Sequence, residues 1–235
     1  MPAPLMIDAC REFGLPAAFF TVHLTAADRE AATFRKNSKA TSRDEARVVA
    51  LYDEAARLFR GVSEASGYHH ADLPDPRDYQ DDAELVAEAV RADAGLGPED
   101  PVPNATRALE RLGIGVVDNL DHLDEEARGH TAVSRPSHHI HRPLVARVTD
   151  LPGAVKRLTL LHEAGHLIFD RDLAAPVSSS RSLEEKRAYK FAGAFLIPER
   201  VVRARVSETL TCTDTCRSRL TTASRPVPSS CVPAS

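Results

Sequence analysis

The sequence predicts an α+β fold that is mainly helical, with a small β-sheet beside one central helix and a helical region in front of it. Apolar residues recur at helical spacing in several segments, whereas only two short stretches are rich in β-branched residues. Turn-forming residues separate these segments. The length of 235 residues allows one large domain or two small ones.

The N-terminal part, residues 1–65, is predicted to be helical, with breaks at 14–16 and at 37–42. Its clearest helix runs over 43–59, because the apolar residues there form one stripe along a helix. The residues of this stripe are Val48, Leu51, Ala55, Leu58 and Phe59. We expect this stripe to be buried.

Residues 67–79 are rich in proline and aspartate, which stop helices and suit an exposed connection. The sequence therefore predicts a helical region and linker over residues 1–75. A second domain is expected over 76–210, and a disordered tail over 211–235.

The second domain begins with alternating helix and strand signals. An amphipathic pattern predicts a helix over 82–94, and Asn104 is a candidate N-cap for a further helix that ends before Gly113. The β-branched run at 114–120 predicts a strand. Residues 129–149 contain turn residues around a second apolar run, which predicts a hairpin or meander.

The helical pattern that follows residue 153 contains the motif HExxH, formed by His162, Glu163 and His166. Residues four apart lie on one face of a helix, so both imidazoles can reach one metal ion. About 0.03 accidental matches to this motif are expected in a chain of this composition. The motif therefore predicts a zinc site on this helix.

Zinc in a catalytic site needs a third protein ligand, and the next helical segment offers Glu184 and Glu185. Periodicity alone does not choose between these two glutamates. Ser182 followed by Glu185 also matches a capping box, in which the glutamate would only bind the Ser182 amide. Both alternatives remain open at this level.

Two segments, LLHEAGHLIF and EEKRAYKFAGAFLIP, resemble the ImmA/IrrE family of bacterial zinc metallopeptidases. Members of that family pair HExxH with a downstream helix that reads ExxAxxFAxxLxxP. The resemblance extends over about residues 80–210 and implies a zincin-like metallopeptidase domain, with Glu185 as the third ligand because it stands three residues before Ala188. One departure is Tyr189, where the family commonly has asparagine.

The resemblance also implies a mechanism. Zn²⁺ held by His162, His166 and Glu185 would acidify a bound water, and Glu163 would act as general base. Asp170 or Asp172 could accept a hydrogen bond from a ligating imidazole. In zincins a peptide substrate adds to a sheet edge beside the metal-binding helix.

The strand over residues 144–148 is our candidate for that edge. A cluster of three histidines precedes it, formed by His138, His139 and His141. This cluster could supply an oxyanion stabiliser or a second metal site. An exposed polar turn is the preferred interpretation.

Composition excludes several other classes of function. A net charge of −4 and an aromatic content of 5% lack the signature of a general nucleic-acid-binding protein. Residues 1–65 resemble only the segment that follows a helix-turn-helix module in the family, so no direct DNA binding is predicted. The absence of a secretory signal and of a long apolar run predicts a cytoplasmic protein with no membrane partner.

The last residues, 211–235, concentrate Cys, Ser, Thr and Pro without periodicity. We interpret them as a tail translated out of frame, with a natural disordered tail as the alternative. The expected function is that of a zinc-dependent endopeptidase that cuts a regulatory protein, such as a helix-turn-helix repressor. The alternatives are a catalytically inactive zinc-binding regulator and a fragment that does not fold stably.

Overall fold

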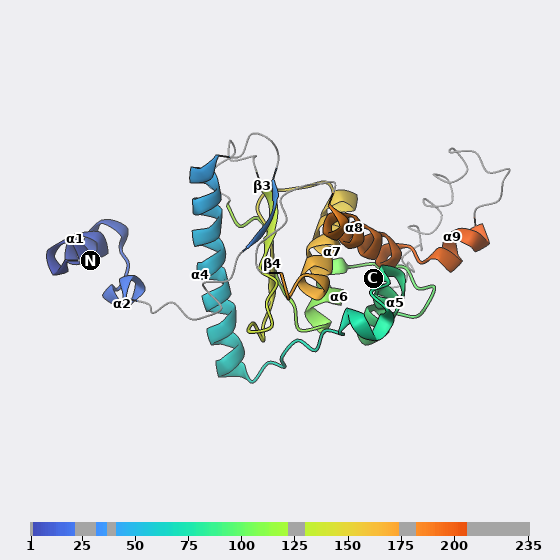
Figure 1. The fold of residues 1–235 in the computed structure, drawn as a ribbon. Coiled ribbons are helices and arrows are strands. Elements are labelled where there is room, and N and C mark those ends of the chain that lie inside the picture. Colours follow the sequence, from blue (N-terminus) through green and yellow to red (C-terminus); the bar gives the residue numbers. More distant parts are fainter. Residues whose placement is uncertain (1, 22–31, 37–40, 122–129, 174–181, 206–235) are drawn as a thin grey trace, which may run out of the picture.

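The structure, a computed structural model, describes residues 2–21, 32–36, 41–121, 130–173 and 182–205. The predicted α+β fold, mainly helical with a small sheet, is confirmed (Figure 1). In chain order the elements are α1 (Ala3–Phe13), α2 (Ala17–Phe20), β1 (Thr33–Lys36), α4 (Ser42–Ser66), the 3-10 helix η1 (Pro76–Tyr79), α5 (Ala83–Asp93), α6 (Ala105–Arg111), β2 (Gly115–Val117), β3 (His130–Ser134), β4 (Leu144–Arg147), α7 (Gly153–Phe169), α8 (Leu183–Leu196) and α9 (Glu199–Arg205).

The sheet has four strands in the order β1-β3-β4-β2. β3 is antiparallel to both of its neighbours, and β4 is parallel to β2. The interpretation of residues 144–148 as the sheet edge is therefore wrong. All four residues of β4 are buried, because β4 has a strand on each side and helices on both faces.

Two hydrophobic clusters lie on opposite faces of the sheet. Leu144 and Ala146 point to the cluster beneath α4, whereas Val145 between them belongs to the larger cluster formed with α5, α6, α7 and α8. This alternation is that of a strand, whose successive side chains point to opposite faces. Figure 1 shows α4 on one side of the sheet and α7 on the other. The helix with the HExxH motif thus lies directly against the sheet.

Among its described residues, the N-terminal region departs from the helical prediction for residues 1–65 at one place, and most of the predicted break at 37–42 lies outside them. Thr33–Lys36 forms β1, which pairs antiparallel with β3. The predicted break at 14–16 is confirmed, since α1 ends at Phe13 and Gly14 has the left-handed conformation of a helix C-cap. Within the predicted stripe Val48 is 1% exposed, but Leu58 is 64% exposed. The buried stripe of α4 therefore covers only part of the predicted one.

Helix caps fix the starts of the helices in the second domain. The Asp82 side chain accepts a hydrogen bond from the Glu84 backbone amide at the start of α5. The Asn104 side chain accepts one from the Arg107 backbone amide at the start of α6. The prediction for Asn104 is confirmed. The division of the chain at residue 75 stays a prediction, and the tail 211–235 lies outside the described residues.

No helix among the described residues is long and apolar enough to cross a membrane.

Candidate metal centre

Helix α7 buries the HExxH motif against the sheet and against α8. His162 is 0% exposed, Glu163 1% and His166 4%. Burial of three polar side chains costs free energy unless each has a partner. The hydrogen-bond and ion-pair partners of these side chains therefore determine what the site can do.

Gly165, inside the motif, allows α8 to approach α7 closely. A Cβ atom at this position would lie 3.1 Å from the Cα of Ala188 and 3.3 Å from the Cδ1 of Phe191. Only a residue without a side chain fits here without movement of α8. The close approach brings the first turn of α8 over the two histidines.

The structure brings Glu185, and not Glu184, to the histidines. The Ser182 hydroxyl accepts a hydrogen bond from the Glu185 backbone amide at the N-terminus of α8, so the cap is present. The Glu185 carboxylate does not turn back to the cap, as a capping box would require, but reaches His162 and His166. The cap and the contact with the histidines coexist, because they use the amide and the carboxylate of the same residue.

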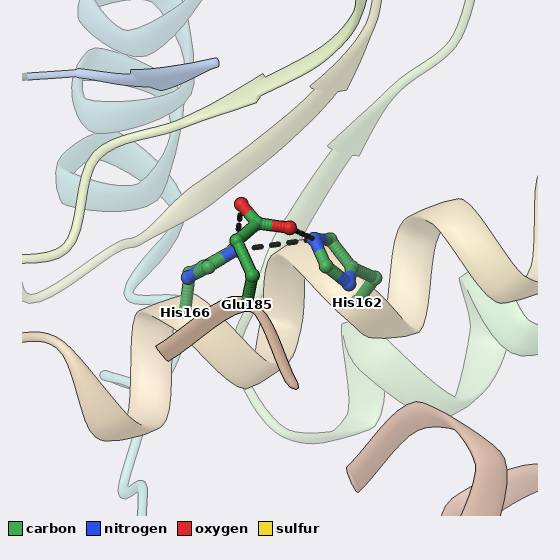
Figure 2. Close-up of side chains that lie close together, drawn as sticks. All are labelled: His162, His166 and Glu185. Carbon is green, nitrogen blue, oxygen red and sulfur yellow. Dashed lines mark hydrogen bonds and ion pairs between the residues drawn. The ribbon is translucent and has the colours of Figure 1, made fainter. Parts of the chain in front are cut away.

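The ligand atoms of the three residues converge on one point (Figure 2). The Nε2 atoms of His162 and His166 are 3.1 Å apart. Nε2 of His162 is 3.3 Å from Oε2 of Glu185, and Nε2 of His166 is 3.4 Å from Oε1. Two ligands bound about 2.0 to 2.1 Å from a tetrahedral zinc ion lie about 3.3 to 3.4 Å apart. The arrangement therefore fits a zinc ion in both donor type and spacing.

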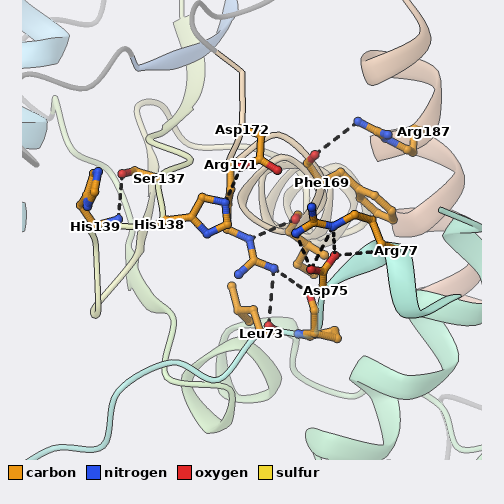
Figure 3. Close-up of polar contacts among 12 residues, drawn as sticks. Leu73, Asp75, Arg77, Ser137, His138, His139, Phe169, Arg171, Asp172 and Arg187 are labelled. Atoms are coloured by element: carbon orange, nitrogen blue, oxygen red, sulfur yellow. Dashed lines mark hydrogen bonds and ion pairs between the residues drawn. The ribbon is translucent and has the colours of Figure 1, made fainter. Parts of the chain in front are cut away.

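His166 is oriented by a chain of polar contacts behind it. Its Nδ1 atom is 2.5 Å from Oδ2 of Asp170, whose other oxygen accepts a hydrogen bond of 2.8 Å from Arg187. Arg187 also contacts the backbone oxygen of Phe169 at the end of α7 (Figure 3). A proton on Nδ1 leaves the lone pair of Nε2 directed at the site.

The carboxylate and the imidazoles of the site shift one another's pKa. Burial would raise the pKa of Glu185, but hydrogen bonds from His162 and His166 lower it to about 2. Burial would lower the pKa of His166, but hydrogen bonds to Asp170 and Glu185 raise it to about 10. A metal ion at this point would therefore compete with a proton on His166.

The ring of His162 is held by packing. Its centroid lies 4.2 Å from that of Tyr189, on the next turn of α8. Nδ1 of His162 is buried and has no hydrogen-bond partner among the described residues. Tyr189, the position that departs from the family pattern, thus covers one of the two histidines.

Glu163 has a partner that the sequence did not indicate. The Ser134 hydroxyl, at the end of β3, donates a hydrogen bond of 2.7 Å to Oε2 of Glu163. Both side chains are almost fully buried. Ser134 lies 29 residues before Glu163, and no motif connects them, so only the packing of β3 on α7 could reveal this contact.

The histidine cluster before β4 lies apart from the three ligands. His138 contacts Asp172 at 2.6 Å, with both side chains at least half exposed, and the backbone amide of His139 donates to Ser137 (Figure 3). His139 and His141 line a cavity of about 600 Å³ beside α4. The preferred interpretation of the cluster as polar turn residues is compatible with these contacts. Asp170 and Asp172 were the two candidates for a hydrogen bond with a ligating imidazole. Asp170 makes this bond with His166, whereas Asp172 contacts His138, which is not one of the three ligands.

Part of the chain is similar to a known family. Residues 115–221 match the profile of Peptidase_M78, the IrrE N-terminal-like domain. This match includes β2 and both helices of the candidate site, and it confirms the resemblance to the ImmA/IrrE family. No curated protein and no solved structure gives a significant match.

Proposed function

We propose that this chain is a zinc-dependent endopeptidase, because residues 115–221 match the IrrE N-terminal-like domain of the Peptidase_M78 family. The observation that carries the proposal is the convergence of two imidazole nitrogens and one carboxylate at distances that suit tetrahedral zinc. His162, His166 and Glu185 would hold the ion and leave a fourth position for water or substrate. A structural zinc site, by contrast, has four protein ligands.

Zinc at this position would supply a Lewis acid that lowers the pKa of a water molecule and polarises the scissile carbonyl. The protein residues perform the proton transfers. Glu163 is the candidate general base, because it follows His162 directly on the same helix. The hydrogen bond from Ser134 holds one of its carboxylate oxygens, so the other oxygen would take the proton from water and deliver it to the leaving amine.

The substrate that we propose is a regulatory protein, such as a helix-turn-helix repressor. This part of the proposal rests on the resemblance to the ImmA/IrrE family. An adjacent repressor gene in the genome would identify a candidate substrate.

Metal analysis of the purified chain tests the ligand set. We expect one zinc per chain, lost in Glu185→Ala and retained in Glu184→Ala, which changes the neighbouring carboxylate on the same helix turn. Equal zinc content in the two variants would contradict the role of Glu185.

Cleavage of the candidate repressor tests the reaction. Glu163→Gln should keep its zinc and lose cleavage, because an amide cannot take a proton from water. Cleavage at the same rate by Glu163→Gln would refute the mechanism.

A second candidate is a zinc-binding regulator without catalytic activity. The observation that favours it is the burial of Glu163, which is 1% exposed. A general base must come within hydrogen-bond distance of the proton that it removes. Zinc content and repressor cleavage, measured on the same full-length chain, distinguish the two functions. A chain that contains zinc but cuts no repressor would support the regulator.

A further inference from the structure

Strand β1 lies at the edge of the sheet that is next to the candidate site. It pairs antiparallel with β3, with Thr33 opposite Ser134 and Arg35 opposite Ala132. In Figure 1, β1 is the short blue strand alongside β3. The other side of β3 is paired with β4. β1 therefore occupies the only side of β3 that a further strand could join.

Thr33 connects β1 to the candidate general base. Its hydroxyl lies 2.8 Å from the Ser134 hydroxyl and 3.1 Å from the Ser134 backbone oxygen. The Ser134 hydroxyl in turn donates to Glu163. Thr33 is 8% exposed and Ser134 0%. Two hydrogen bonds thus lead from β1 to the carboxylate that would act on a substrate.

The two histidines and Glu163 are largely covered in this arrangement, whereas the Glu185 side chain is 16% exposed. His162, Glu163 and His166 expose between 0% and 4% of their surface. A scissile carbonyl must lie about 3 Å from the groups that act on it. Release of a segment beside the site would therefore ease the approach of a substrate.

Extended peptides bind proteins by adding a strand to a sheet edge, where backbone hydrogen bonds provide affinity. Resting on the proposed function, we infer that the outer edge of β3 is the surface that binds the substrate. We further infer that Thr33–Lys36 is this chain's own occupant of that surface. The partner is then an extended, unfolded segment with a small or β-branched residue opposite Ser134. It binds only when β1 leaves.

β1 is a short strand with an irregular register, as such an exchange requires. The strand has four residues, and its register shifts between Arg35 and Lys36. Ala32, 7% exposed, anchors it in the cluster beneath α4. An occupant in equilibrium with a released state lowers the apparent affinity for a substrate by the fraction of time that the edge is free.

The alternative is that β1 is a permanent fourth strand that holds Ser134, and through it Glu163, in position. The two interpretations predict opposite effects of Thr33→Val. This variant keeps the shape and strand propensity of threonine but removes its hydroxyl contacts. If β1 is an occupant, the variant is more active, chiefly through a lower KM. If β1 is a permanent support, the variant is less active, through a lower kcat.

The first experiment measures peptide binding, so it does not depend on catalysis. A fluorescein-labelled peptide with the sequence EAATFRKNS, which copies residues 30–38, is titrated into full-length Glu163→Gln with and without Thr33→Val. Binding should be about fivefold tighter with Thr33→Val, the change that one net hydrogen bond makes in an equilibrium constant. Equal or weaker binding would overturn the inference.

The second experiment locks β1 in place. Directly opposite residues of antiparallel strands are close enough for a disulfide, and Arg35 lies opposite Ala132. The oxidised variant Arg35→Cys/Ala132→Cys should lose peptide binding and regain it on reduction, whereas Arg35→Cys alone should be unaffected. Unchanged binding by the locked chain contradicts the inference. A zinc-loaded chain that binds the peptide but cuts no repressor instead refutes the proposed function alone.

Discussion

The close approach of α7 and α8 at Gly165 makes a quantitative prediction for Gly165→Ala. Alanine favours a helix over glycine by about 1 kcal/mol. The new Cβ, however, would lie 3.1 Å from the Cα of Ala188, a backbone atom that can yield only if α8 moves. Overpacking of this kind costs about 1 to 3 kcal/mol. The net expectation is a loss of about 0 to 2 kcal/mol in the free energy of unfolding.

Gly193 provides a matched control in α8. A Cβ there meets no atom within 4 Å, so Gly193→Ala should gain the full helix term of about 1 kcal/mol. The two variants should therefore differ by about 1 to 3 kcal/mol in urea unfolding of the metal-free chain. Gly165→Ala should also bind zinc more weakly, because Glu185 moves with α8. If Gly165→Ala were as stabilising as Gly193→Ala, the packing argument would be refuted.

Further predictions concern the site and the packing of α4 on the sheet. Asp170→Asn should weaken zinc binding by about 10- to 100-fold, since it removes the carboxylate behind His166. Competition with a chromogenic chelator measures this affinity. Asp172→Asn, which changes a carboxylate that is 72% exposed, should leave the affinity unchanged. The pKa of His166, raised to about 10 in the metal-free chain, means that zinc must displace a proton at lower pH. Zinc affinity should therefore rise by about tenfold per pH unit between pH 7 and 9. In the metal-free chain, the contribution of protonated His166 to stability is complete below the ordinary histidine pKa of about 6.5. This contribution is lost as the pH rises through about 10. An increase in the free energy of unfolding over this pH range would contradict the assigned contacts of His166. Tyr52→Phe should lower the free energy of unfolding by about 1 to 2 kcal/mol, because it removes the buried hydrogen bond to the Leu144 oxygen; an unchanged urea midpoint would contradict this.

The sequence predicted those elements whose signals are local. The helix with His162 and His166 follows from a motif and a periodicity within 17 residues. The start of α6 follows from one capping side chain, that of Asn104. Local patterns were less reliable for burial, because Leu58 belongs to an apolar stripe wider than the surface of the sheet that α4 covers, and it is 64% exposed.

The sequence by itself determined the chemistry available to this protein: two histidines and a glutamate on one helix face, with two glutamates nearby on the next. Tertiary structure decided which glutamate joins them, because Gly165 lets α8 approach until Glu185 reaches both imidazoles. Tertiary structure alone also made Thr33–Lys36 a strand. A four-residue segment has no stable strand conformation without a partner, and its partner β3 lies about a hundred residues away in the chain.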